Sequence, residues 1–162
     1  MSGEVLQSGN ITPGLLAAWA TDGVIQDAGV TFTNTYGLFS YTKQQINFNS
    51  TNTDNPLLIN LPAGYTRYRV SMIVISNASQ TLTTATCGVF TQSGALGTAI
   101  VTTGSAITVS QSAADTINNM QLLSVNNQNT MSLVDTTLYF RVQIAQGVAA
   151  TGTVTIFYQP LP

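Results

Sequence analysis

The stretch Tyr65–Phe90 constrains the fold more than any other part of this sequence. Its first half, Arg67–Ser76, reads RYRVSMIVIS, so polar and apolar residues alternate before β-branched residues occupy both sides. Such a period of two is typical of a half-buried strand. A polar break at Ser76–Thr81 precedes a second apolar segment, Thr84–Thr91, so the pattern predicts a hairpin of two central antiparallel strands. Four residues are predicted to share the apolar side of its first strand: Tyr68, Val70, Met72 and Val74.

The rest of the chain from residue 36 repeats short apolar segments separated by turn residues. Many short strands with regular turn signals predict an antiparallel β-sandwich, and eight to ten strands in about 125 residues fit a jelly roll best. Residues 110–119 are compatible with one helical turn. The predicted strands are Leu38–Tyr41, Gln45–Phe48, Leu57–Asn60, Arg67–Ser76, Thr84–Thr91, Thr98–Thr102, Ala106–Ser110, Met120–Val125, Thr137–Ala145 and Thr153–Tyr158. Two sets alternate with a period of two: Leu138, Phe140, Val142, Ile144, and Val154, Ile156, Tyr158.

Residues 1–35 are predicted to form an arm separate from the β-domain at 36–162. Thr12 is a suitable N-cap and Pro13 a suitable first residue for a short helix over the GLLAAWA segment. A helix of about two turns is too short to be stable alone, so it must dock on a partner surface or fold back on its own domain. The predicted docking residues are Ile11, Leu15, Leu16, Trp19, Val24 and Ile25.

The charge content excludes several classes of partner. Only 6% of the 162 residues are charged and the net charge is −2, whereas about 25% is usual in soluble domains. The four cations are Lys43, Arg67, Arg69 and Arg141, too few and too scattered for a nucleic-acid surface. The chain shows no basic and apolar leader and no run near the ~20 apolar residues of a membrane helix. We therefore expect a protein made in a cytoplasm and not secreted, with a surface meant to be covered by partners.

The residue inventory leaves little room for catalysis. The chain has no histidine and one cysteine, Cys87, which removes histidine-based triads and most zinc sites. Cys87 lies in a predicted strand and is interpreted as a small buried hydrophobe. Outside the arm the acids are Asp54, Asp115 and Asp135, each in a turn or loop where aspartate commonly binds the backbone. We expect no enzyme, no cofactor and no metal.

Four polar or aromatic residues on predicted central strands are candidates for an interface or a glycan contact: Arg67, Arg69, Arg141 and Tyr139. Guanidinium groups suit both kinds of contact, because they are planar and present several donors. A solvated sheet face with cross-strand pairing explains the same residues without any ligand. On so charge-poor a surface the interface is favoured.

Three stretches resemble small structural proteins of tailed bacteriophages. The N-terminal stretch Gln7–Gly29, QSGNITPGLLAAWATDGVIQDAG, is similar to a segment that usually runs GN-[VI]-TPGH-x-x-x-W-x-x-x-G-V-I-x-D-x-G, with Leu15 here at the position of the histidine. Leu61–Phe90 and Leu138–Gly147 look like the β-domain of virion proteins described as head decoration or tail fibre proteins. The resemblance implies assembly into the virion as a homotrimer, with the major capsid protein or another virion subunit as partner, and no catalytic residue.

Three hypotheses follow. In the first, the chain is a non-enzymatic capsid decoration or cement protein that docks through its N-terminal arm and stabilises the head. In the second, it is a head or tail fibre module that recognises host surface glycan through exposed Tyr and Arg on loops distal to the arm. In the third, it is a fibre-borne depolymerase, which needs two of Asp54, Asp115 and Asp135 within about 10 Å.

Overall fold

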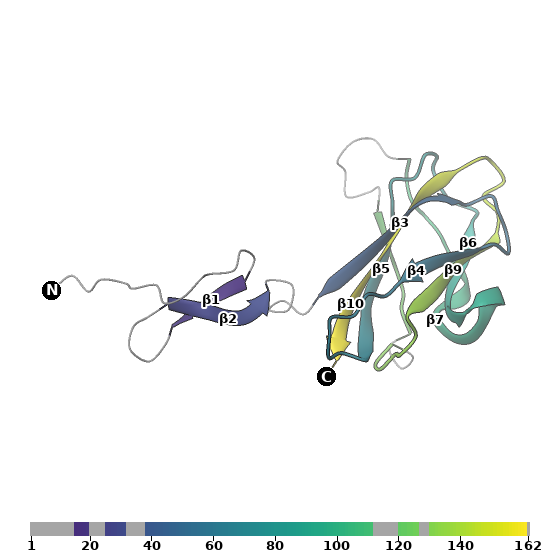
Figure 1. The fold of residues 1–162 in the computed structure, drawn as a ribbon. Coiled ribbons are helices and arrows are strands. Elements are labelled where there is room, and N and C mark those ends of the chain that lie inside the picture. The colour runs from purple at the N-terminus through teal and green to yellow at the C-terminus, as the bar shows by residue number, and fades with distance from the viewer. Residues whose placement is uncertain (1–14, 20–24, 32–37, 112–119, 127–129, 162) are drawn as a thin grey trace. The chain divides into compact units, whose positions relative to one another are not determined.

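The computed structural model describes residues 15–19, 25–31, 38–111, 120–126 and 130–161. The chain divides into two compact units, Met1–Leu38 and Phe39–Pro162, which we call the N-terminal unit and the β-domain (Figure 1). The expected boundary lay between residues 35 and 36. Residues 112–119, which include most of the segment considered for a helical turn, lie outside the described residues.

The N-terminal unit contains a β-hairpin where the sequence predicted a helix. Strand β1 (Leu15–Trp19) pairs antiparallel with β2 (Ile25–Thr31). Trp19 is directly opposite Ile25, and a bulge interrupts the register nearer Leu15. The helix prediction is therefore wrong over Leu15–Trp19. The apolar residues of this short segment suit either structure, and the local pattern does not reveal the strand downstream that supplies cross-strand hydrogen bonds.

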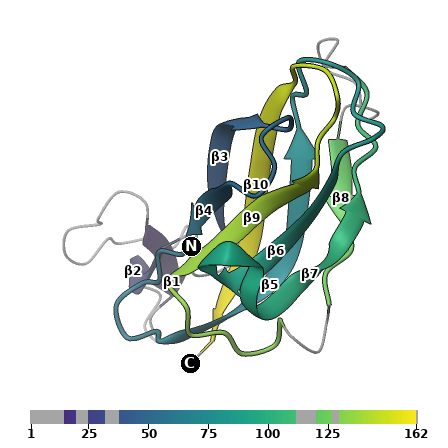
Figure 2. The same cartoon turned by 90° about the vertical axis from the view of Figure 1, so that its right-hand side faces the viewer.

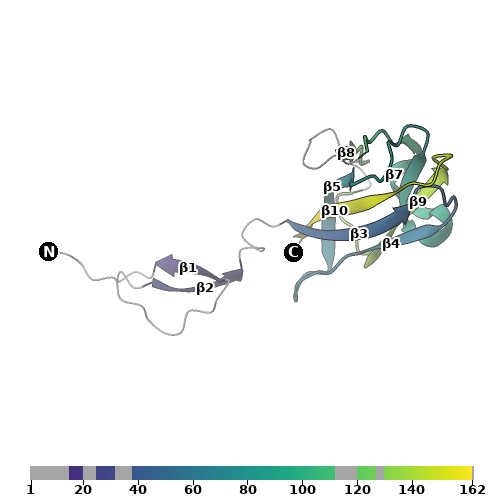
Figure 3. The same cartoon turned by 90° about the horizontal axis from the view of Figure 1, so that it is seen from above.

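The β-domain consists of two four-stranded antiparallel sheets, which confirms the all-β sandwich. One sheet has the order β3-β10-β5-β8 and the other β4-β9-β6-β7 (Figures 1 and 3). A single 3₁₀ turn, η1 (Ser93–Ala95), joins β6 to β7. The strands are β3 Phe39–Asn47, β4 Asp54–Leu58, β5 Arg67–Ser76, β6 Thr86–Gln92, β7 Leu96–Ala106, β8 Met120–Leu123, β9 Thr137–Ile144 and β10 Thr151–Leu161.

The strand pairs are nested along the sequence. The innermost pair is β6 with β7, and around it lie the pairs β5 with β8, β4 with β9 and β3 with β10. Successive pairs alternate between the two sheets, and the pairs β5–β10 and β6–β9 complete each sheet. The arrangement is equivalent to one long antiparallel ribbon rolled into two layers.

The predicted hairpin of β5 and β6 is wrong, because the two strands lie in different sheets. The connection between them, residues 77–85, crosses from one sheet to the other and buries Ala78, Leu82 and Ala85. The side chain of Gln146 holds this connection. Its Oε1 accepts hydrogen bonds from three successive backbone N–H groups, those of residues 83, 84 and 85, each at 3.1 Å. The polar linker of residues 77–85 therefore connects the two sheets and does not form the turn of a hairpin.

A β-bulge reverses the predicted faces of β5 halfway along the strand. Tyr158 pairs with Val70 and Phe157 with Met72, so Ser71 is an extra residue on β5. Tyr68 and Val70 point into the sandwich as predicted, but beyond the bulge Ile73 and Ile75 are buried instead. Met72 and Val74, predicted on the apolar inner side, are only partly buried and belong to the outer face.

A similar bulge explains why β3 was predicted as two strands. The sequence predicted two strands with a break before Gln45, and the structure has one strand with a bulge there. Gln45 has a φ of 57°, in the left-handed region, which is typical of a local disruption in a ladder.

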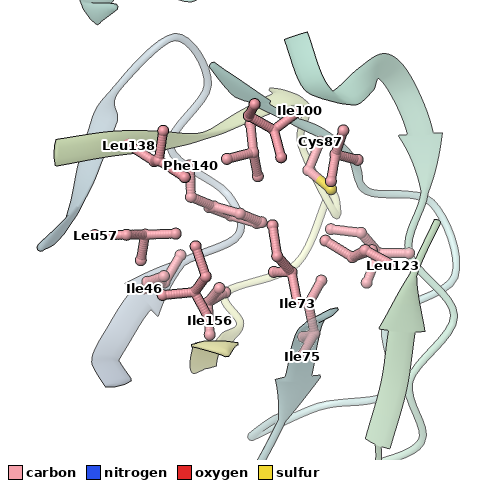
Figure 4. Packing of buried hydrophobic residues seen from close by; sticks show 14 of the residues in the cluster. Ile46, Leu57, Ile73, Ile75, Cys87, Ile100, Leu123, Leu138, Phe140 and Ile156 are labelled. Carbon is pink, nitrogen blue, oxygen red and sulfur yellow. The ribbon is translucent and has the colours of Figure 1, made fainter. Parts of the chain in front are cut away.

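The core lies between the two sheets and contains buried residues from every strand of the β-domain. Figure 4 shows side chains from both sheets pointing toward one another. The strand β10 alternates perfectly between buried and half-buried residues, which confirms the predicted inward set Val154, Ile156 and Tyr158. Cys87 is fully buried in this core, and burial raises the pKa of its thiol to about 12. Its interpretation as a buried hydrophobe is confirmed.

Candidate functional site

The predicted docking residues of the arm lie on the hairpin or outside the described residues. Leu15, Leu16 and Trp19 are on β1 and Ile25 begins β2. Ile11 and Val24 lie outside the described residues. An isolated two-stranded hairpin, like a short helix, is at best marginally stable in water.

The candidate arginines do not form one surface. Arg67 and Arg69 project from the outer face of β5, and Arg69 donates a hydrogen bond to Gln159 on β10 at 2.7 Å. Arg141 and Tyr139 lie on β9, in the opposite sheet (Figure 3). The four residues therefore belong to two outer faces on opposite sides of the sandwich. The sequence placed all of them on central strands, which is right, but it does not distinguish the two layers.

Arg141 forms an ion pair with Asp54 within the β-domain. Its guanidinium lies 2.9 Å from the carboxylate of Asp54, which also accepts hydrogen bonds from the Ser93 hydroxyl and the Gly94 N–H. Burial alone would raise the pKa of Asp54, but the hydrogen bonds from Ser93, Gly94 and Arg141 outweigh it and hold that pKa below 3.8. The cluster joins β4, β9 and the β6–β7 turn, so it stabilises the edge of the sheet rather than offering a free arginine.

Of the three candidate carboxylates, the structure describes two, Asp54 and Asp135, and these lie far apart. Asp54 is opposite Arg141 in the β4–β9 ladder, and Asp135 lies six residues before Arg141 along the chain. At ~3.3 Å per residue the two aspartates are roughly 20 Å apart. Asp115 lies outside the described residues. In the described part of the chain, no group of three His, Cys, Asp or Glu could hold a metal ion.

The two ends of the β-domain differ in polarity. We call the end where β3 begins and β10 finishes the entry end, because residue 38 leads into it (Figure 2, lower end). The ladders bring the end of β4, the start of β5 and the start of β9 to this end. Five large apolar side chains are exposed here: Leu58 42%, Tyr65 37%, Leu96 62%, Met131 63% and Val134 64%.

The described loops at the opposite, far end are uncharged. They cover residues 48–53, 77–85, 107–111 and 145–150, and these contain no charged residue, no tyrosine and no arginine. Val148, 56% exposed, and Ile144, 55% exposed at the end of β9, are the large exposed hydrophobic residues there among those described. The glycan hypothesis expected exposed Tyr and Arg on these loops, and the described loops do not provide them.

A second apolar surface, which the sequence did not predict, lies on the outer face of the sheet β3-β10-β5-β8. It is a shallow hollow of about 470 Å³. Met120 and Leu122 on β8 are 55% and 63% exposed at its rim. The signal was present in β5, where apolar residues occupy both sides of the strand after Ser71. The lining residues are Met72, Val74, Ser76, Met120, Leu122, Thr155 and Phe157.

Comparison with known proteins finds no matching family model, no similar curated protein and no similar solved structure. Among the described residues, no helix has the length and apolar character needed to cross a membrane.

Proposed function

We propose that the chain is a non-enzymatic structural protein of a bacteriophage virion, a decoration or cement subunit that stabilises the head. It docks through its N-terminal unit and the entry end of the β-domain. The resemblances at Gln7–Gly29, Leu61–Phe90 and Leu138–Gly147 supply the class of protein. They also imply a homotrimer, with the major capsid protein as the other partner.

The observation that carries this proposal is the uneven distribution of exposed apolar residues over the β-domain. Five of them lie at the entry end, next to the covalent connection with the N-terminal unit, whereas two, Ile144 and Val148, lie at the far end, whose described loops carry no charge. Apolar residues grouped on one surface mark an interaction site. A subunit of this kind covers its entry end with the shell and leaves the far end in solvent. Each Å² of apolar surface covered contributes ~25 cal/mol, repeated in every copy on the particle.

We further propose that the β-domain is a jelly roll. The nested pairing of β3 with β10, β4 with β9, β5 with β8 and β6 with β7 supports this fold, as does the alternation of successive pairs between two four-stranded sheets. Jelly rolls occur in viral capsid proteins and in lectins, so the fold suits the decoration role and does not by itself exclude glycan binding.

The alternative, a head or tail fibre module for host glycan, has weaker support. Arg141 is bound to Asp54, and the described far-end loops lack tyrosine and arginine. The one aromatic residue of these described loops, Phe48, is fully buried, so the loops lack the exposed stacking platform that sugar rings usually require.

The test is co-sedimentation of the full chain with empty, undecorated heads of the phage that encodes it. Binding of the unmodified protein should be saturable. The double variant Met131→Glu, Val134→Glu should bind at least tenfold more weakly, because two exposed apolar contacts become charges at the interface. The matched control is Val148→Glu, which changes a residue of similar exposure at the far end and should bind normally.

A second variant tests the role of the hairpin. Trp19→Ala in the full chain should weaken binding to heads while the β-domain unfolds at the same temperature as in the unmodified protein. If the β-domain instead melts earlier, the N-terminal unit belongs to its core and is not a docking element. If the unmodified protein does not sediment with heads at all, the decoration role is wrong, and binding to host cells becomes the next measurement.

A further inference from the structure

Tyr68, near the start of β5, has a hydroxyl group that is buried in the core of the β-domain. The side chain is 0% exposed, and its hydroxyl makes no hydrogen bond with any described residue. Burying a hydroxyl without a hydrogen bond is costly, because water bonds the same group in the unfolded chain. Buried polar groups of native proteins are paired with protein or with ordered water. The hydroxyl of Tyr68 therefore requires a partner.

The neighbouring Tyr158 has a hydroxyl whose hydrogen bonds are made. The rings of Tyr68 and Tyr158 are 5.7 Å apart in an edge-to-face arrangement. The Tyr158 hydroxyl accepts a hydrogen bond from the N–H of Asn60 and donates one to the carbonyl oxygen of Asn60, both at 3.0 Å. The two tyrosine hydroxyls do not bond each other. The partner of the Tyr68 hydroxyl must therefore come from another group.

The structure places a carboxylate, that of Asp135, on the same side of the chain as the Tyr68 ring. Tyr68 is opposite Leu133 in a short antiparallel bridge with backbone hydrogen bonds of 2.9 and 2.8 Å, so their side chains share a face. After the buried Leu133, Val134 is exposed and Asp135 is partly buried. This alternation turns Asp135 to the inner side again. Burial is the main cause that raises the pKa of the Tyr68 hydroxyl, and the negative charge of Asp135 raises it further.

We propose that the Tyr68 hydroxyl and the Asp135 carboxylate together bind one ordered water molecule. The hydroxyl donates its proton to the water oxygen, and the water donates one of its own protons to the carboxylate. A single water bridges two polar groups that do not bond each other directly. Asp135 is only partly buried and forms no ion pair with a described residue, so the water has a path from solvent. The site supplies the two polar partners that a buried water needs.

The water adds a side-chain attachment to the segment that carries Met131 and Val134, two of the exposed apolar residues of the entry end. Backbone hydrogen bonds hold this segment at residues 130, 133 and 136. The bridge through Asp135 fixes it between the last two of these points. Its value for docking rests on the proposed function, whereas the water site does not and can be tested without phage heads.

Urea unfolding of the full chain with Tyr68→Phe tests whether the hydroxyl has a partner, because this change removes the hydroxyl and keeps the ring. If the hydroxyl binds a water, the unfolding equilibrium constant should rise about fivefold. If the hydroxyl has no partner, the same change removes a group that is costly to bury, and the constant should fall. The matched control Tyr139→Phe, on the outer face of β9, should leave the constant within about twofold. A constant that falls or stays unchanged in Tyr68→Phe overturns the proposal.

A double-mutant cycle with Asp135→Ala tests the second partner. Because the water needs both groups, the effect of the double variant on the unfolding constant should be at least threefold smaller than the product of the single effects. Tyr139→Phe combined with Asp135→Ala should give effects that multiply.

A crystal structure of the unmodified protein then identifies the bound molecule. It should show a water oxygen about 2.5–3.0 Å from the Tyr68 hydroxyl oxygen. Independent effects of Tyr68→Phe and Asp135→Ala overturn the role of Asp135. A hydroxyl that is bonded directly to protein, or surrounded by carbon atoms alone, overturns the water site.

Discussion

Gln146 offers the sharpest test of how the two sheets are held together. It lies just after β9 and is 9% exposed. Its Oε1 accepts hydrogen bonds from the N–H groups of Thr83, Thr84 and Ala85, and its Nε2 donates to the carbonyl oxygen of Thr81 at 3.1 Å. One amide side chain thus satisfies four backbone groups of the connection between β5 and β6.

Replacing this residue by leucine removes all four hydrogen bonds and leaves the four backbone groups without their partner. Thr83 and Thr84 are exposed, so water can replace the acceptor at their N–H groups, but Ala85 is 1% exposed and its N–H has no substitute. A net hydrogen bond is worth about 1 kcal/mol, and a buried donor left unpaired costs about 1–3 kcal/mol. We therefore expect Gln146→Leu to lower the free energy of unfolding by about 3 kcal/mol. For a domain of this size that corresponds to a fall in Tm of roughly 10 °C.

Urea unfolding followed by far-UV circular dichroism measures the loss, and amide hydrogen exchange locates it at residues 81–85. The matched control is Gln143→Leu, because the side chain of Gln143 accepts a single hydrogen bond, from the Gly104 N–H, and should cost no more than about 1 kcal/mol. If the two variants lose the same stability, or if exchange at residues 83–85 stays slow in Gln146→Leu, the side chain does not hold the connection.

Two further predictions concern one ion pair and one close contact. The pKa of Asp54 is held below 3.8 in the folded protein, so the stabilisation by its contact with Arg141 is complete above the unfolded-state pKa and is lost as pH falls through the folded-state pKa. Urea titrations should show that Asp54→Asn is less stable than the unmodified protein at pH 7 and that the difference shrinks as the pH falls below about 5; a constant difference would contradict the assignment. A Cβ at Gly152 would lie 2.7 Å from the Phe48 ring and 3.2 Å from the Ser76 carbonyl oxygen. Gly152→Ala should therefore cost about 2 kcal/mol of unfolding free energy, whereas an unchanged urea midpoint would show that the ring moves freely.

Much of the β-domain could be predicted because its strands carry clear local patterns. The bounds of β5, Arg67–Ser76, are predicted to the residue, and the inward face of β10 follows from its alternation. In β9 the prediction holds as far as Val142, whereas Ile144 at the end of the strand is 55% exposed. The predictions that failed concern features that depend on strand partners distant in sequence. The assignment of β5 and β6 to different sheets is set by β10 and β9, which lie more than 45 residues further along the chain. The local pattern of a linker does not contain that information.

The candidate surfaces could not be predicted from the sequence for a related reason. A bulge of one residue at Ser71 reverses which side chains of β5 reach the outside, so Met72 and Val74 were assigned to the core. Arg141 and Arg67 are likewise separated because β9 and β5 lie in different sheets. The alternation of residues along each strand does not show to which sheet the strand belongs. At Leu15–Trp19, the segment has helical and strand character at once, and its partner β2 decided the outcome.

The nested strand pairs also imply an order of folding. Only β6 and β7 are neighbours in sequence, joined by η1. Each further pair closes a long loop, but the loss of chain entropy is smaller once the pair inside it has formed. The outermost pair joins Phe39 to Tyr158, 119 residues later in the sequence, so the ribbon is expected to close from its middle outward and slowly. β3 pairs with β10, so it has no partner until β10, the last strand of the β-domain, has been synthesised. The strand that follows the N-terminal unit is thus expected to be the last strand of the β-domain to become ordered.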